Sequence, residues 1–191
     1  MRSLIDAGLP VSAVISNRAD AQGLQIAAAH GVAARVVEHR AFASREAFEA
    51  VLAKEIDRFS PRLVALAGFM RVLTPTFVER YAGRLLNIHP SLLPAFPGLN
   101  THQRALEAGV KVHGCTVHFV TAELDHGPIV IQAEVRVRGD DSAETLAARV
   151  LRREHLIYPR AAEWFLEGRL VIRDGEVRVK GEHAQVLHSP D

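Results

Sequence analysis

Short apolar runs alternate with longer stretches of mixed polarity through the first half of the chain. The runs are rich in Val, Ile, Leu and Ala and are bounded by Gly, Pro and polar residues, a pattern that favours buried strands. We expect strands at residues 11–16, 34–39, 61–68 and 84–91.

The stretches between these runs contain helix-forming residues and end near Gly, which commonly terminates a helix. Ser44 can cap one of them, with Glu46 and Glu49 in its first turns, where the helix dipole favours acidic groups. Pro75 suits the first position of another. We expect helices at residues 2–8, 19–31, 45–59, 74–83 and 101–109.

The pattern changes after residue 110. Two strands, 115–121 and 127–137, follow each other closely, which favours an antiparallel addition to the parallel sheet that alternating strands and helices predict. Ser142 can cap a long helix over 143–168, which Pro159 is expected to kink or split. Two runs around Asp174-Gly175 predict a hairpin over 170–181.

We therefore predict an α/β fold: a Rossmann-like, mostly parallel sheet flanked by helices, with an antiparallel addition and a C-terminal hairpin. Residues 1–181 are expected to form a single domain, and residues 182–191 a tail.

Composition narrows the class of protein. The 191 residues are 48% hydrophobic and 24% charged, with a net charge of +1. This near-neutral balance gives no reason to expect binding to nucleic acid or to an anionic membrane. The single cysteine, Cys115, excludes an internal disulfide. No apolar run has membrane-spanning length and no signal peptide is apparent, so we expect a cytoplasmic protein.

The stretch "LLNIHPSLLPAFPG" (85–98) carries the first candidate chemistry. Asn87 and His89 stand two apart and so face the same side of a strand that ends at a proline-rich loop. Ligands of α/β sheets bind at such strand ends, where His can transfer protons and an Asn amide can donate to an oxyanion. The alternative is that both side chains satisfy the backbone of the following turn.

A second candidate lies in "VTAELDHGPIV" (120–130). The Asp125 carboxylate, if placed beside an imidazole, would stabilise its charged form and fix its orientation. The alternative is turn chemistry, because Asp near Gly commonly forms turns. The sequence alone does not bring Asp125 to His89.

The segment "HGCTVHF" contains His113, Cys115 and His118. His118 alternates with apolar neighbours, so it faces either a site or a solvated side of the sheet. No CxxC or HExxH spacing is present, so we expect no zinc or other metal. Cys115 is interpreted as a packing residue within a strand.

Six segments together resemble the phosphoribosylglycinamide formyltransferases, folate-dependent enzymes of purine synthesis, over about residues 12–170. They are "ISNRADAQGL", "SREAF", "LAGFMRVL", "LLNIHPSLLPAFPG", "HGCTVHFVTAELDHGPI" and "REHLIYP". The resemblance implies a Rossmann-like fold and transfer of a formyl group from 10-formyltetrahydrofolate to the amine of glycinamide ribonucleotide. It also implies small-molecule partners, no metal, and a monomer or weak homodimer.

The resemblance also implies roles for particular residues. Asn87 and protonated His89 would stabilise the oxyanion, and Asp125 would keep the imidazole charged and positioned. The family's folate-binding positions fall on Arg45, Met70, Arg71, Val72, Leu73, Asn87, Ala122, Glu123, Leu124 and Asp125. On the nucleotide side they fall on Glu154 and His118. Each of these has an ordinary alternative in core packing or a solvated surface.

Three alternatives stay open. Another folate-dependent formyltransferase, acting on methionyl-tRNA or an amino sugar, is disfavoured because the tRNA enzymes carry a further C-terminal domain. A 10-formyltetrahydrofolate hydrolase would use the same Asn, His and Asp, together with an N-terminal regulatory domain. The third is a catalytically impaired fragment that binds folate only.

The start of the sequence departs from the family pattern. The family begins with a strand and a G-x-G-S-N loop that holds the substrate phosphate, whereas Met1 aligns inside the following helix, about eighteen residues later. A mis-assigned start site or a shortened version of the protein is expected rather than a natural variant. Folate binding should then survive better than nucleotide binding, and strands around Val14 and Val64 should have an unpaired edge or a gap.

Overall fold

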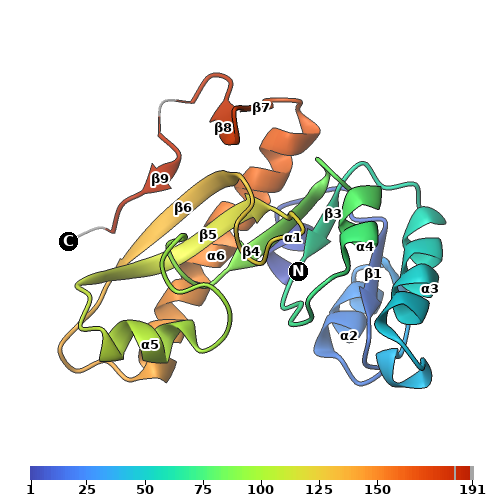
Figure 1. Ribbon diagram of the computed structural model, residues 1–191, viewed down its shortest axis with the longest axis horizontal. Helices are drawn as coiled ribbons and strands as arrows, with labels where there is room; N and C mark the ends of the chain where they lie inside the picture. Colours follow the sequence, from blue (N-terminus) through green and yellow to red (C-terminus); the bar gives the residue numbers. More distant parts are fainter. Residues whose placement is uncertain (183, 190–191) are drawn as a thin grey trace.

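A computed structural model describes residues 1–182 and 184–189 and shows helices packed on β-sheets (Figure 1). The helices are α1 (Arg2–Asp6), α2 (Gln22–Ala29), α3 (Arg45–Asp57), α4 (Pro75–Arg80), α5 (Thr101–Glu107) and α6 (Ala143–Leu166), with a 3₁₀ turn η1 (His39–Ala41). The strands are β1 (Ala13–Ser16), β2 (Ala33–Val36), β3 (Val64–Leu66), β4 (Leu85–His89), β5 (Val112–Phe119), β6 (Ile129–Arg136), β7 (Leu170–Arg173), β8 (Glu176–Val179) and β9 (Val186–Leu187).

The largest sheet is mixed and has the strand order β3-β4-β5-β6-β9. Strands β3 and β4 are parallel, whereas β5 is antiparallel to both of its neighbours. The predicted α/β class, the antiparallel addition and the C-terminal hairpin are therefore confirmed.

A break separates β1 from the main sheet. Strand β1 pairs in parallel with β2 alone, and β3 pairs with β4 alone, among the residues that the structure describes. The expected gap between the strands around Val14 and Val64 is thus present. Ile15 of β1 and Val64 of β3 nevertheless pack against one apolar cluster that includes Phe48 of α3. The shared helix layer, rather than backbone hydrogen bonds, connects the two sheets.

Helix α6 lies across the back of the five-stranded sheet (Figure 1). It begins with a capping box between Ser142 and Thr145, and its apolar face is buried. The prediction that Pro159 could split this helix was wrong, because α6 continues unbroken through it. Ile157 and Ala161, on either side of Pro159, are fully buried. This packing offsets the backbone hydrogen bond that proline removes.

The C-terminal segment differs from its prediction in one respect. The hairpin β7–β8 forms around Asp174 and Gly175, both at positive φ, as two-residue hairpin turns require. Part of the expected tail, however, is strand β9, which pairs with the open edge of β6. The Gln185 side chain also donates to the backbone oxygen of Val130. Residues 183, 190 and 191 of the expected tail lie outside the described residues.

Candidate active site

Strand β4 brings the two central candidates to one end of the main sheet. Asn87 pairs with His118 of β5, and His89 pairs with Thr116. Their side chains therefore lie on one face of β4, as the spacing of two predicted. Asn87 is half-buried, whereas His89 is only 5% exposed.

The loop that follows β4 is held from behind by Thr116, whose side chain is fully buried. Its hydroxyl donates to the backbone oxygen of Ser91 at 2.7 Å and accepts the backbone N–H of Leu93 at 3.0 Å. The Gln132 amide also donates to this hydroxyl and to the backbone oxygen of Leu93. These bonds fix the proline-rich loop against β5 and β6, and such support keeps a site in one geometry.

His89 makes a different contact with each ring nitrogen. Nε2 lies 3.0 Å from the backbone oxygen of Phe96. Because that oxygen can only accept, Nε2 carries a hydrogen. Nδ1 lies 3.5 Å from Oδ2 of Asp125. One edge of the His89 ring therefore hydrogen-bonds the backbone of the following loop, as the alternative interpretation expected. The other edge faces the Asp125 carboxylate.

Asp125 joins two loops at this point. Its backbone φ is 53°, in the left-handed region that Asp tolerates better than most residues. Oδ2 accepts the backbone N–H of Gly98 at 2.8 Å, so the carboxylate holds the end of the proline-rich loop as well as facing His89. The Asp125 side chain is only 8% exposed. At such a buried position the carboxylate attracts a charged imidazole strongly.

His118 orients the Asn87 amide. Burial lowers the pKa of His118, so the ring is neutral at neutral pH. Nδ1 donates to the backbone oxygen of Phe119 at 2.9 Å. The Nε2 lone pair is then left to accept from Nδ2 of Asn87, which lies 3.3 Å away, because a neutral imidazole has one donor and one acceptor nitrogen. One hydrogen of the Asn87 amide is thereby directed to His118.

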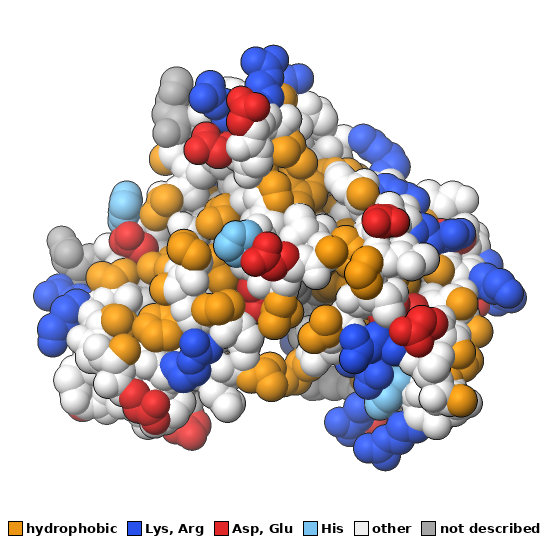
Figure 2. Space-filling view, viewed as in Figure 1, with side chains coloured by type: hydrophobic (Ala, Val, Ile, Leu, Met, Phe, Trp, Pro, Cys, Tyr) orange, Lys and Arg blue, Asp and Glu red, His pale blue; other side chains and the backbone are white. Residues whose placement is uncertain are grey.

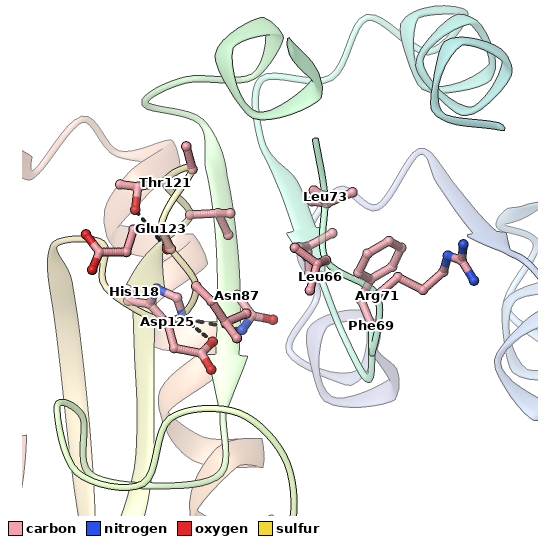
Figure 3. A pocket seen from close by; sticks show the side chains of 13 residues that line it. Leu66, Phe69, Arg71, Leu73, Asn87, His118, Thr121, Glu123 and Asp125 are labelled. Carbon is pink, nitrogen blue, oxygen red and sulfur yellow. Dashed lines mark hydrogen bonds and ion pairs between the residues drawn. The ribbon is translucent and has the colours of Figure 1, made fainter. Parts of the chain in front are cut away.

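A pocket opens beside these residues, between β4 and the loop that follows β3 (Figure 3). It is lined by Leu66, Phe69, Arg71, Val72, Leu73, Asn87, His118, Val120, Thr121, Ala122, Glu123, Leu124 and Asp125. Asn87, His118 and Asp125 form one side, and Leu66, Phe69 and Leu73 face them from the other (Figure 3). In the space-filling view, hydrophobic side chains gather over the central part of this face around an acidic side chain and a histidine, while Lys and Arg lie mostly toward its rim (Figure 2). The pocket therefore combines an apolar wall with a polar end.

Most predicted site residues line this pocket, but four do not. His89 is one of the four, and it faces the Asp125 carboxylate instead. Arg45 is exposed at the start of α3, and Met70 is 76% exposed at the tip of its loop. Glu154 lies half-buried on α6, where burial raises its pKa and the nearby Met1 amino group opposes that rise. His118, expected on the nucleotide side, lies beside Asn87.

Arg71 lines the pocket with only part of its side chain. The side chain points away from Asn87 (Figure 3). Its guanidinium lies 5.6 Å from the ring centre of Phe48. The charged end of Arg71 is therefore engaged with α3 rather than with the polar end of the pocket.

Sequence reasoning missed two contacts made through the backbone, the oxygen of Phe96 and the N–H of Gly98. Almost every residue type carries these groups, so the sequence gives no signal for them. It also missed Leu66 and Phe69 of the apolar wall, although both belong to the quoted segment "LAGFMRVL" (66–73). That segment could have identified them.

A metal site and a reactive cysteine are two other possible chemistries for this chain. Among residues 1–182 and 184–189, no group of His, Cys, Asp and Glu side chains is arranged to hold a metal ion. Burial raises the pKa of the Cys115 thiol, which keeps it protonated and a poor nucleophile.

In the part of the chain that the structure describes, no helix is both long and apolar enough to cross a membrane.

The buried histidine His113 is expected to make the fold less stable in acid. Burial, then the neighbouring His102, lowers the pKa of His113 from 6.5 to about 4. Between these pH values the unfolded chain binds a proton that the folded chain does not, so stability falls as pH falls. This group should remove about 2 kcal/mol of unfolding free energy between pH 7 and pH 5.

Urea unfolding at both pH values would measure this loss. His113→Gln should reduce the loss, while His30→Gln, at an exposed position, should leave it unchanged. An identical pH dependence in wild type and His113→Gln would contradict the assignment.

The chain is similar to known formyltransferases in sequence and in structure. The Formyl transferase family profile matches residues 3–162. The phosphoribosylglycinamide formyltransferase of Escherichia coli K12 is 52% identical over 172 residues, covering 90% of this chain and 81% of that protein. The crystal structure of glycinamide ribonucleotide transformylase 1 from Symbiobacterium toebii has a TM-score of 0.91 at 48% identity, covering 93% of this chain and 87% of that one. The enzyme structure from Coxiella burnetii also has a TM-score of 0.91, at 44% identity, covering 99% of this chain and 92% of that one. The chain therefore belongs to the phosphoribosylglycinamide formyltransferase family.

Proposed function

We propose that Asn87, His89 and Asp125 carry out the reaction of this family at the end of β4. That reaction transfers a formyl group from 10-formyltetrahydrofolate to the primary amine of glycinamide ribonucleotide in purine biosynthesis. The observation that carries the assignment is that Asn87 and Asp125 lie at the polar end of an apolar pocket, with the His89 imidazole 3.5 Å from the Asp125 carboxylate.

In the first step, the amine nitrogen attacks the formyl carbon and the C=O electrons move onto oxygen. The oxyanion needs hydrogen-bond donors that are already in place. Asn87 has two amide hydrogens, and His118 holds one of them. The second hydrogen can then point at the developing charge, so His118 acts by positioning Asn87.

His89 supplies the second donor. Its Nε2 hydrogen is bound to the Phe96 oxygen, so the Nδ1 edge is the one that acts. The Asp125 carboxylate, 3.5 Å from Nδ1, stabilises the imidazolium without holding its hydrogen in a short bond. The Nδ1 hydrogen is therefore available to the oxyanion, and the imidazolium can serve as the general acid.

The intermediate then collapses: the bond from the formyl carbon to N10 of the folate breaks, N10 gains a proton and the former amine nitrogen loses one. Asp125 and an ordered water provide a route for that proton. No step forms a covalent bond between the substrates and the protein.

The folate is expected to occupy the apolar side of the pocket. Exposed hydrophobic side chains cluster on its two flanking loops: Met70 is 76% exposed, Val72 48% and Leu124 55%. Exposed apolar groups around a concave site are typical of ligand binding. Arg45 and Glu154 are proposed to bind the folate and nucleotide at their outer ends, beyond the described pocket.

A formyl-transfer assay tests this function directly. The 191-residue chain is incubated with 10-formyltetrahydrofolate, with and without glycinamide ribonucleotide, and the absorbance of released tetrahydrofolate is followed. We expect release that requires the nucleotide. Release without it would indicate a hydrolase instead. No release from folded protein that still binds folate would indicate a folate-binding module. A single domain over 1–181, a monomer or weak homodimer, and a cytoplasmic location remain predictions.

A further inference from the structure

Helix α3 contains a buried carboxylate that the reaction does not use. Glu49 is 4% exposed, and burial of a carboxylate is costly unless its oxygens accept hydrogen bonds. Both oxygens accept the backbone N–H of Thr74, at 3.1 and 3.2 Å, and Oε2 also accepts the Thr74 hydroxyl. In the described part of the chain, Glu49 has no basic partner, so all of its hydrogen bonds go to one residue.

Thr74 stands where the pocket loop ends and α4 begins. Its hydroxyl accepts the backbone N–H of Phe77 at 3.3 Å while it donates to Glu49. The loop immediately before it, residues 67–73, supplies one wall of the pocket (Figure 3). Glu49 therefore fixes the end of this wall without lining the pocket itself.

The core holds only part of this loop. Leu73 is buried and Phe69 packs against the same apolar cluster, whereas Met70 and Val72 are exposed. The other support comes from the same turn of α3, where the Phe48 ring lies beneath the Arg71 guanidinium. Two adjacent residues of α3, Phe48 and Glu49, therefore contact the loop at Arg71 and at Thr74.

We propose that Glu49 is a positioning residue for the folate co-substrate: it holds residues 69–73 in the orientation that receives the ligand. This inference rests on the proposed function. A carboxylate suits the task because it accepts the N–H and the O–H of Thr74 together, whereas an amide offers a single oxygen and repels donors with its NH₂ group.

Glu49→Gln tests the inference with two readouts. Binding of 5-formyltetrahydrofolate, a stable folate that requires no turnover, should weaken about tenfold, the cost of losing a charge-assisted hydrogen bond. The KM for 10-formyltetrahydrofolate should rise similarly, while the KM for glycinamide ribonucleotide and kcat stay within about twofold. A merely structural role would change both KM values or neither.

Glu55→Gln is the matched control on the same helix. Glu55 pairs with Arg35 and Arg58, away from the pocket loop, so this change should leave folate binding unaltered. Wild-type folate binding in folded Glu49→Gln, or an equal loss in Glu55→Gln, would overturn the proposal.

If Glu49→Gln does not fold, Thr74→Val decides the question. It keeps the carboxylate and the backbone contact but removes the hydroxyl, and with it both the donor to Glu49 and the acceptor for the Phe77 N–H. Weaker folate binding supports the inference and unchanged binding overturns it. Because the binding experiment needs no turnover, a wild-type chain that binds folate but transfers no formyl group would contradict the proposed function and leave this inference to its own test.

Discussion

Replacement of His89 with alanine is expected to lower kcat for formyl transfer by about a thousandfold, the joint effect of losing an oxyanion donor and the general acid. The fold should change little. The imidazole makes a hydrogen bond to the backbone of Phe96, and loss of such a bond costs about 1 kcal/mol. Steady-state kinetics and urea unfolding of the same preparation would separate the two effects.

His126→Ala is the control for this variant. His126 lies beside Asp125 in sequence, but its side chain is 66% exposed and pairs with Glu123. It should retain wild-type turnover. Full activity in His89→Ala would refute the assignment of His89.

Replacement of Asp125 with alanine should lower kcat by about 10³- to 10⁴-fold, as expected when the carboxylate that orients a catalytic histidine is removed. Asp125 faces Nδ1 of His89 and binds Gly98, so alanine removes both the charge and a loop contact. Asp125→Asn separates them, because its side-chain oxygen can still accept from Gly98. We expect the Asn variant to fold like wild type and to lose most of the activity.

Asp140→Asn provides the corresponding control. Asp140 is an exposed carboxylate that is not part of the pocket lining. Removing a solvated charge of this kind should change kcat by less than about twofold. An Asp125→Asn enzyme with wild-type kcat would show that the charge of Asp125 is not needed, and the proposed proton route would then be wrong.

Local patterns predicted most of the fold. Ser44, Thr74 and Ser142 cap the helices that follow them. Ser44 and Ser142 were identifiable because a cap acts over three residues. Asn87 and His89 could be paired because strand periodicity alone places them on one face. The order of strands in the sheet was not predicted, because periodicity within a strand does not indicate which strand lies beside it.

The features that escaped prediction depend on segments distant in sequence. Glu49 was interpreted as a carboxylate favoured by the dipole of its own helix, and only the packing of α3 beside the pocket loop reveals its bonds to Thr74. Strand β9 is two residues long, too short for periodicity to detect. Its pairing results from the free edge that β6 offers.

Because of the break between β1 and β3, side-chain packing rather than backbone hydrogen bonds joins β1 and β2 to the larger sheet. A two-stranded sheet holds its amides less firmly than a five-stranded one, so β1 and β2 should exchange hydrogen with solvent through openings smaller than global unfolding. The pocket loop packs on α3, which shares an apolar cluster with Ile15 of β1, whereas Asn87 belongs to the larger sheet. A ligand that contacts both sides ties the two sheets together. Occupancy of the pocket would therefore slow amide exchange in strands that the ligand never touches.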